Sequence, residues 1–140
     1  MDDTQARPGE RTSPVAWKTW LKTARPFSLT ASVSPVLVGT AVAAYDGTFN
    51  AVRFLVALFA GLFLQIGANF FNEYYDYRYG LDSLESLGST TVIFRHEMTA
   101  AQVLAGGIGS FAIASLSGVA LIFLSGPAVI LFGLAGMGIA

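Results

Sequence analysis

Three oxygen-bearing side chains follow one another closely where a long apolar run gives way to a polar segment. Asn72, Asp76 and Asp82 come directly after the apolar residues 54–71. Acidic groups at a membrane edge are costly to place, so their presence there points to a function. Amide and carboxylate oxygens are the hard ligands that Mg²⁺ prefers. The group therefore predicts a magnesium site, and an ion held there could bind a diphosphate.

The spacing of the polar residues supports a shared helix face. Gln65, Asn69, Asn72 and Asp76 are spaced by four, three and four residues, which places them on one stripe of a helix. Gly80 is expected to end that helix, so that Asp82 can fold back toward Asp76. A second interpretation stays open on spacing alone: the amides join helices, and the two aspartates are solvated loop charges.

The composition indicates a membrane protein. Of 140 residues, 54% are hydrophobic and 12% are charged, which is too apolar for an ordinary soluble domain. There is no cysteine and a single histidine, His96, so disulfides, thiolate sites and a histidine-based zinc site are not expected. A net charge of −1 gives no footprint for nucleic acid.

Apolar length predicts the fold class. A membrane-crossing helix needs about 20 mostly apolar residues, and the segments 27–45, 54–71 and 100–124 qualify. A fourth apolar segment begins at residue 127 and runs to residue 140, short of a full span. We therefore expect an all-α, polytopic membrane helix bundle, truncated to about three and a half transmembrane helices, as the N-terminal part of a larger protein.

The residues before the first span predict a short helix in the membrane interface. Ser13 and Pro14 can begin a helix as N-cap and first residue. Trp17, Trp20 and Leu21 then share one face, as in a helix that lies at the membrane surface. We accordingly divide the chain into a cytoplasmic tail with an interfacial helix, 1–26, and a transmembrane domain, 27–140.

Local signals mark the remaining turns and contacts. Asp46-Gly47 predicts a tight turn between the first two spans. Thr99 and Gln102 predict a capping box at the start of the third. That span carries a stripe of small residues that favours close helix packing, and its members are Gly106, Ser110, Ala114 and Gly118.

Basic residues predict the orientation. Five precede the first span, two lie between the second and third spans, and only Arg53 lies between the first and second. Basic residues concentrate on the cytoplasmic side. We therefore expect a multi-pass protein of the cell (inner/cytoplasmic) membrane with its N-terminus and the 72–98 segment in the cytoplasm.

Two further features near the acidic group allow two interpretations each. The aromatic cluster around it, Phe70, Phe71, Tyr74, Tyr75, Tyr77 and Tyr79, is typical of an interfacial belt. One or two of these rings could instead line a pocket and stabilise a cation. Arg95 is either a membrane anchor or a bidentate clamp for phosphate oxygens.

Several stretches resemble the UbiA superfamily of intramembrane prenyltransferases. Asn72-x3-Asp76-x5-Asp82 is similar to the first of that family's two aspartate-rich motifs. The branch most similar to this chain is the one that prenylates 1,4-dihydroxy-2-naphthoate in the menaquinone pathway. The matching stretches are Arg25-Pro-Phe-Ser-Leu-Thr-Ala-Ser-Val-Ser-Pro35-Val-Leu-Val-Gly39, Asn72-Glu-Tyr-Tyr-Asp76, Gly80-Leu-Asp82 and Arg95-His96.

The resemblance implies a chemistry and its residues. Mg²⁺ would be bound by Asn72, Asp76 and Asp82, with the two aspartates as catalytic groups and with Asn72 and Arg95 contacting the substrate. A polyprenyl diphosphate would lose its diphosphate, and the allylic cation would be attacked by an aromatic acceptor. In this branch the acceptor's carboxylate leaves as CO₂ and demethylmenaquinone forms. The second aspartate motif would lie beyond residue 140, so we expect the 140-residue chain alone to be inactive.

Other functions stay open beside this one. The acceptor could be 4-hydroxybenzoate, homogentisate, haem or chlorophyllide instead. From another class altogether, the chain could belong to a non-catalytic membrane scaffold or a transporter, with the polar stripe lining helix contacts or a solute path. The expected partners of the enzyme are a polyprenyl diphosphate, an aromatic acceptor and the lipid bilayer, with no nucleic acid.

Overall fold

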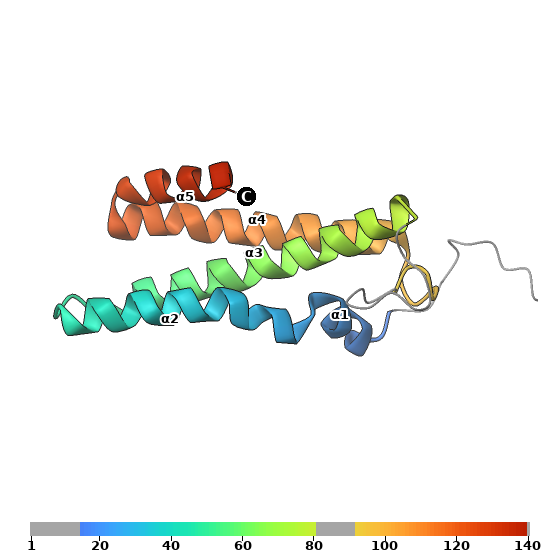
Figure 1. Ribbon diagram of the computed structural model, residues 1–140, viewed down its shortest axis with the longest axis horizontal. Helices are drawn as coiled ribbons and strands as arrows, with labels where there is room; N and C mark the ends of the chain where they lie inside the picture. Colours follow the sequence, from blue (N-terminus) through green and yellow to red (C-terminus); the bar gives the residue numbers. More distant parts are fainter. Residues whose placement is uncertain (1–14, 81–91, 140) are drawn as a thin grey trace, which may run out of the picture. The chain divides into compact units, whose positions relative to one another are not determined.

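Helices form every regular element in the part of the chain that the structure, a computed structural model, describes: residues 15–80 and 92–139. In chain order they are α1 (Trp17–Ala24), the 3-10 helix η1 (Pro26–Leu29), α2 (Thr30–Tyr45), α3 (Ala51–Arg78), α4 (Ala100–Ser125) and α5 (Ala128–Ile139) (Figure 1). The predicted all-α class is confirmed.

Three segments are long and apolar enough to cross a membrane: Pro26–Tyr45, Ala51–Arg78 and Ala100–Ser125. They coincide with the three predicted spans, and α3 is the one that differs most. It continues as a regular helix beyond residue 71 to Arg78, so the polar residues 72–78 are its last turns. The candidate metal ligands thus lie on the same helix that is long and apolar enough to cross a membrane.

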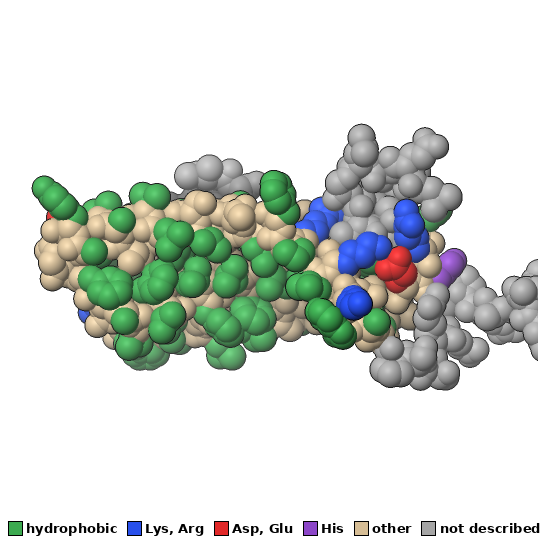
Figure 2. Space-filling view, turned by 90° about the horizontal axis from the view of Figure 1, so that it is seen from below, with side chains coloured by type: hydrophobic (Ala, Val, Ile, Leu, Met, Phe, Trp, Pro, Cys, Tyr) green, Lys and Arg blue, Asp and Glu red, His purple; other side chains and the backbone are tan. Residues whose placement is uncertain are grey.

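The chain packs as two compact units, and α3 and α4 each contribute to both. Unit 1 comprises Met1–Phe27 and Ile66–Gly109, and unit 2 comprises Ser28–Gln65 and Ser110–Ala140. The sequence of unit 2 holds only two charged residues, Asp46 and Arg53. Figure 2 shows green apolar side chains over the helices of unit 2, while most of the visible Lys and Arg gather around α1 in unit 1. Unit 2 therefore has a surface suited to lipid tails or to further apolar helices.

Within unit 2, α2 and the first part of α3 form a helical hairpin (Figure 1). The turn between them is the one predicted at Asp46-Gly47, where Gly47 has a φ of +68°. Gly61 of α3 lies in van der Waals distance of Ser32, since a Cβ built on it would be 3.7 Å from the Ser32 Cβ. The Ser32 hydroxyl donates a hydrogen bond to Gln65 Oε1 at 3.3 Å. A small residue and one polar contact therefore contribute to the packing of this pair of helices.

The start of α4 is closed by the predicted capping box. The Thr99 N–H donates to Gln102 Oε1 at 2.9 Å, and the Gln102 N–H donates to Thr99 Oγ1 at 3.2 Å. Two backbone donors that the first turn of a helix leaves without helical acceptors are satisfied by this exchange. The prediction is confirmed at both hydrogen bonds.

The core of unit 1 forms where α1, α3 and α4 meet. Phe70 of α3 is 3% exposed and packs against Trp20 of α1, with their ring centroids 5.6 Å apart. Both rings lie over Gly106, where an added Cβ would be 2.7 Å from Phe70 Cε1 and 2.8 Å from Trp20 Cζ3. At Gly107 an added Cβ would likewise be 2.9 Å from Phe71 Cδ2. The two glycines at this end of α4 therefore make room for aromatic rings, whereas the predicted stripe favoured close approach of helix backbones; at Gly118 of that stripe an added Cβ would meet nothing within 4 Å.

One predicted boundary was wrong. Ser13 and Pro14 lie outside the described residues, and α1 begins at Trp17 with Ala16 in the N-cap position. Ala16 has no side chain that could cap the helix, and none does so. The end of the helix packs within unit 1, where Thr23 and Ala24 are both buried.

Substitution of Gly106 tests whether α4 requires a residue without a side chain at this position. We expect Gly106→Ala to be less stable than Gly109→Ala by about 1–3 kcal/mol, because a methyl group at 106 overlaps two rings that are already packed. Gly109 is the matched control, since a Cβ there meets nothing within 4 Å. Both changes gain the same helix propensity, so their difference isolates packing. Thermal unfolding in detergent measures it, and equal stability of the two variants would contradict the packing shown.

The absence of cysteine makes the orientation directly testable. Single cysteines at Thr48 and Tyr79 would mark the two ends of α3. From the distribution of basic residues we expect a membrane-impermeant maleimide to label Tyr79→Cys only from the cytoplasmic side and Thr48→Cys only from the other. Labelling of both positions from one side would contradict a membrane-crossing α3.

Candidate metal and diphosphate site

The last turns of α3 carry the two metal-ligand candidates that the structure describes. Asn72 and Asp76 are four residues apart and therefore lie one turn apart on one helix face. Asn72 is exposed and Asp76 is half-buried, so their oxygens are accessible. The helix ends two residues later at Arg78, and Gly80, with a φ of +67°, turns the chain as predicted. Asp82 lies outside the described residues.

These donors fit the chemistry of Mg²⁺. The described pair supplies one amide and one carboxylate oxygen, and magnesium in proteins usually takes one or two carboxylates together with substrate phosphates and water. Within residues 15–80 and 92–139, no three His, Cys, Asp or Glu side chains gather into a metal-binding group. An ion at the end of α3 would therefore depend on ligands beyond this pair, which a diphosphate and Asp82 could supply.

A third polar residue in the same two turns is buried. Glu73 has no exposed surface, although it lies between Asn72 and Asp76 in the sequence. Its Oε1 accepts a hydrogen bond of 2.6 Å from the Val92 N–H. Its Oε2 lies 3.6 Å from Nη2 of Arg25, which follows α1. A buried carboxylate is costly unless it is paired and hydrogen-bonded, and Glu73 is both.

The segment from Val92 to Met98 forms a closed turn, which we call the 92–98 turn. Both Glu97 and Met98 donate their N–H groups to the Val92 carbonyl, at 2.8 and 3.2 Å. His96 closes it with an N–H to Ile93 O bond of 3.0 Å and a φ of +56°. Val92 is fully buried, while Arg95 is exposed on the turn. The turn therefore has a fixed base and presents Arg95 outward.

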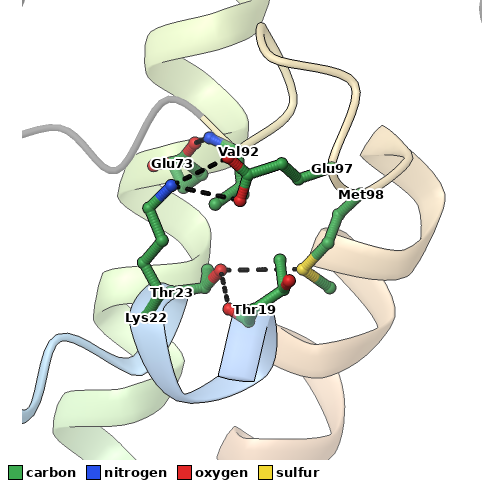
Figure 3. A network of polar contacts seen from close by, with 7 residues as sticks. All are labelled: Thr19, Lys22, Thr23, Glu73, Val92, Glu97 and Met98. Carbon is green, nitrogen blue, oxygen red and sulfur yellow. Dashed lines mark hydrogen bonds and ion pairs between the residues drawn. The ribbon is translucent and has the colours of Figure 1, made fainter. Parts of the chain in front are cut away.

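α1 contacts the 92–98 turn at two further places, which Figure 3 shows together with Glu73 and Val92. Lys22 Nζ forms an ion pair with Glu97 Oε1 at 3.0 Å. The Thr23 hydroxyl, buried at this contact, lies 3.6 Å from the Met98 sulfur. Both contacts join α1 to the last two residues of the turn, Glu97 and Met98.

The rest of the predicted polar stripe serves helix contacts. Asn69 is 3% exposed, and its Nδ2 donates a 2.7 Å hydrogen bond to the carbonyl of Ala24, the last residue of α1. Gln65 accepts from Ser32, as described above. Gln65 and Asn69 therefore join helices, as one interpretation of the stripe expected, whereas the role of Asn72 and Asp76 as metal ligands stays a prediction.

The aromatic cluster divides in a similar way. Phe70 belongs to the core, whereas Tyr75, Tyr77 and Tyr79 are 44%, 42% and 70% exposed. The rings of Tyr75 and Tyr79 are stacked, with their centroids 6.0 Å apart. The exposed tyrosines have the amphipathic character of a membrane-interface belt.

The structure brings together the segments that carry three of the four predicted site residues. Asn72 and Asp76 share the end of α3, and the Glu73–Val92 hydrogen bond attaches the turn that carries Arg95 to that same stretch. Sequence reasoning missed Glu73 as the link. The available signal was its place four residues after Asn69, on the flank of the polar stripe.

The described geometry defines a class of protein: an α-helical membrane protein whose longest helix carries amide and carboxylate side chains in its last turns. Residues 32–140 match the UbiA prenyltransferase family. The chain belongs to this family, and with its three membrane-length helices it is a multi-pass membrane protein.

Curated relatives extend the similarity. The chain is 44% identical over 115 residues to a 1,4-dihydroxy-2-naphthoate octaprenyltransferase of Bacillus subtilis, covering 82% of this chain and 37% of that protein. It is 32% identical over 114 residues to the protein of the same name from Mycobacterium tuberculosis, covering 81% and 39%. It is also 32% identical over 108 residues to UbiA prenyltransferase domain-containing protein 1 of Xenopus tropicalis, covering 76% and 31%.

The chain spans less than half the length of these relatives, from 31% to 39%. No solved structure matches the chain.

Asn69 offers a test of the contact that fixes the end of α1. We expect Asn69→Ala to destabilise the protein by about 1–3 kcal/mol, because it leaves the buried Ala24 carbonyl without this donor. Gln65→Ala is the control on the same stripe, with a longer and less buried hydrogen bond, and we expect it to cost about 0.6 kcal/mol. Thermal unfolding in detergent compares them. A larger loss at Gln65 than at Asn69 would contradict the proposed ranking.

Proposed function

We propose that the protein to which this chain belongs transfers a polyprenyl group from a polyprenyl diphosphate to 1,4-dihydroxy-2-naphthoate, with loss of the ring carboxylate, to give demethylmenaquinone. The observation that carries the proposal is the accessible pair Asn72 and Asp76 at the end of a membrane-length helix. That placement suits a substrate with a charged head and an apolar tail, because the head meets oxygen ligands and the tail can stay in the apolar layer.

The chain's residues have distinct roles in this proposal. Asn72, Asp76 and Asp82 would hold Mg²⁺, which supplies positive charge against the departing diphosphate. Asp76 and Asp82 are the proposed catalytic carboxylates. Arg95, exposed on the 92–98 turn, would bind phosphate oxygens through its planar guanidinium, which suits bidentate contacts.

The acceptor is proposed from the relatives. The Bacillus and Mycobacterium proteins are both named for 1,4-dihydroxy-2-naphthoate. The Xenopus relative is similar at 32% identity and its name states no acceptor, so another aromatic acceptor is the second candidate. Assay of the purified, full-length protein with 1,4-dihydroxy-2-naphthoate, 4-hydroxybenzoate and homogentisate separates the two.

The proposed location of the reaction rests on the orientation predicted from the basic residues. We propose that residues 1–26 are a cytoplasmic tail with an interfacial helix and that residues 27–140 form part of the transmembrane domain. The protein would lie in the cell membrane with its N-terminus and the end of α3 in the cytoplasm. Exposed Trp17 and Leu21 on α1 support a helix that lies in the interface.

Substitution of Asp76 tests the metal and diphosphate assignment. We expect Asp76→Ala to lower the rate of prenyl transfer by about a hundredfold or more, as loss of one charge-stabilising group at a transition state typically does. Asp46→Ala is the matched control, because Asp46 lies in the turn before α3 and is exposed. We expect it to keep the parent rate. The assay uses the full-length protein in membranes, with Mg²⁺ and radiolabelled polyprenyl diphosphate.

The outcome discriminates between the open functions. Equal rates for the parent and Asp76→Ala would contradict the site. Absence of prenyl transfer to any of the three acceptors by a folded parent would contradict the proposed function and favour a non-catalytic membrane protein.

A further inference from the structure

We propose that Glu73 is a positioning residue for diphosphate binding: it fixes the 92–98 turn, and Arg95 with it, against α3 and the end of α1. The inference rests on the proposed function and deepens it, because it concerns how one of the diphosphate contacts is held. No step of the reaction needs Glu73 itself, which has no exposed surface with which to reach a substrate.

Glu73 holds the turn at its base, through Val92. Its Oε1 accepts from the Val92 N–H at 2.6 Å, and the carbonyl of that same residue accepts from Glu97 and Met98. Val92 is therefore the point on which the turn closes and also the point at which the turn is attached to α3. Val92, Ile93 and Met98 also pack in the core, so loss of the attachment would loosen the base of the turn rather than release it, and Arg95 three residues later would be held less firmly.

The charge of Glu73 is paired with Arg25, the residue after α1. Arg25 Nη2 lies 3.6 Å from Glu73 Oε2, and the Arg25 side chain is 21% exposed against 0% for Glu73. The Arg25 backbone adopts a left-handed conformation with a φ of 52°, and its N–H closes α1 on the Lys22 carbonyl. Removal of one member of such a pair leaves the other charge largely buried. The carboxylate thus joins the end of α1 to the base of the turn.

A second, more exposed ion pair joins the same two segments. Lys22 and Glu97 also join α1 to the turn, but their side chains are 43% and 34% exposed. An exposed ion pair is screened by solvent and contributes little to holding two segments together. The inner contact through Glu73 is therefore the one expected to fix the turn, and the outer pair supplies a matched control.

Three variants of the full-length protein in proteoliposomes test the inference. Glu73→Gln keeps an oxygen that can accept from Val92 but loses the charge that faces Arg25. Glu73→Met removes both functions at similar size. Lys22→Ala removes only the exposed ion pair. The readouts are kcat, KM for the polyprenyl diphosphate, and hydrogen exchange of a peptide that covers the 92–98 turn.

We expect Glu73→Met to raise KM by about tenfold or more and to speed exchange of the turn by a similar factor, as loss of a buried hydrogen bond to a charged group implies. The value of kcat should change far less than KM, because the reacting groups are untouched. Glu73→Gln should give a smaller rise in KM, and Lys22→Ala should match the parent. This split between KM and kcat separates a positioning role from general loss of folded protein, which would lower the amount of active enzyme and leave KM unchanged.

Two results would overturn the inference. One is unchanged exchange of the turn in both Glu73 variants. The other is faster exchange with an unchanged KM, which would show that the turn does not position the diphosphate. If Glu73→Met does not fold, Glu73→Gln decides by the same two readouts. A folded parent without prenyl transfer contradicts the proposed function instead, and exchange alone then decides whether Glu73 holds the turn.

Discussion

A carboxylate with no exposed surface is the constraint on which the described part of unit 1 depends. Glu73 must have partners, because an isolated buried charge would cost more than a fold of this size can offset. The partners come from two segments that are distant in the sequence, the residue after α1 and the first residue of the 92–98 turn. Burial of one side chain therefore fixes three segments together, and its neighbours, the exposed Asn72 and the half-buried Asp76, are placed beside that junction.

The same helix meets two different demands along its length. Residues 54–71 of α3 are almost entirely apolar, whereas residues 72–78 include an amide, two carboxylates and Arg78. The structure keeps both stretches in one continuous helix and turns the polar side chains in two directions. Asn69 and Glu73 face inward and bind α1 and the turn, while Asn72 remains exposed. A polar group in a membrane helix is tolerated when it faces protein or water, and α3 provides one example of each.

Local features of the fold were predictable from the sequence. The Thr99–Gln102 capping box, the turn at Gly47 and the end of α3 before Gly80 are confirmed, because each depends on residues that are close in the chain. The start of α1 was not predictable, since Ser13 and Pro14 are good start signals but the helix begins at Trp17 after Ala16, which offers no capping group. The role of Glu73 was also missed, because its partner Val92 is 19 residues away. The spacing from Asn69 places Glu73 beside the polar stripe, but no periodic pattern identifies a partner 19 residues away.

Binding of a polyprenyl diphosphate to the full-length protein in nanodiscs, with and without Mg²⁺, tests the central claim most directly. The proposed site predicts binding that requires the metal and that is lost on chelation, because oxygen ligands at the end of α3 repel a diphosphate unless a cation lies between them. Binding of equal strength in the presence and absence of Mg²⁺ would contradict the assignment of Asn72 and Asp76 as metal ligands.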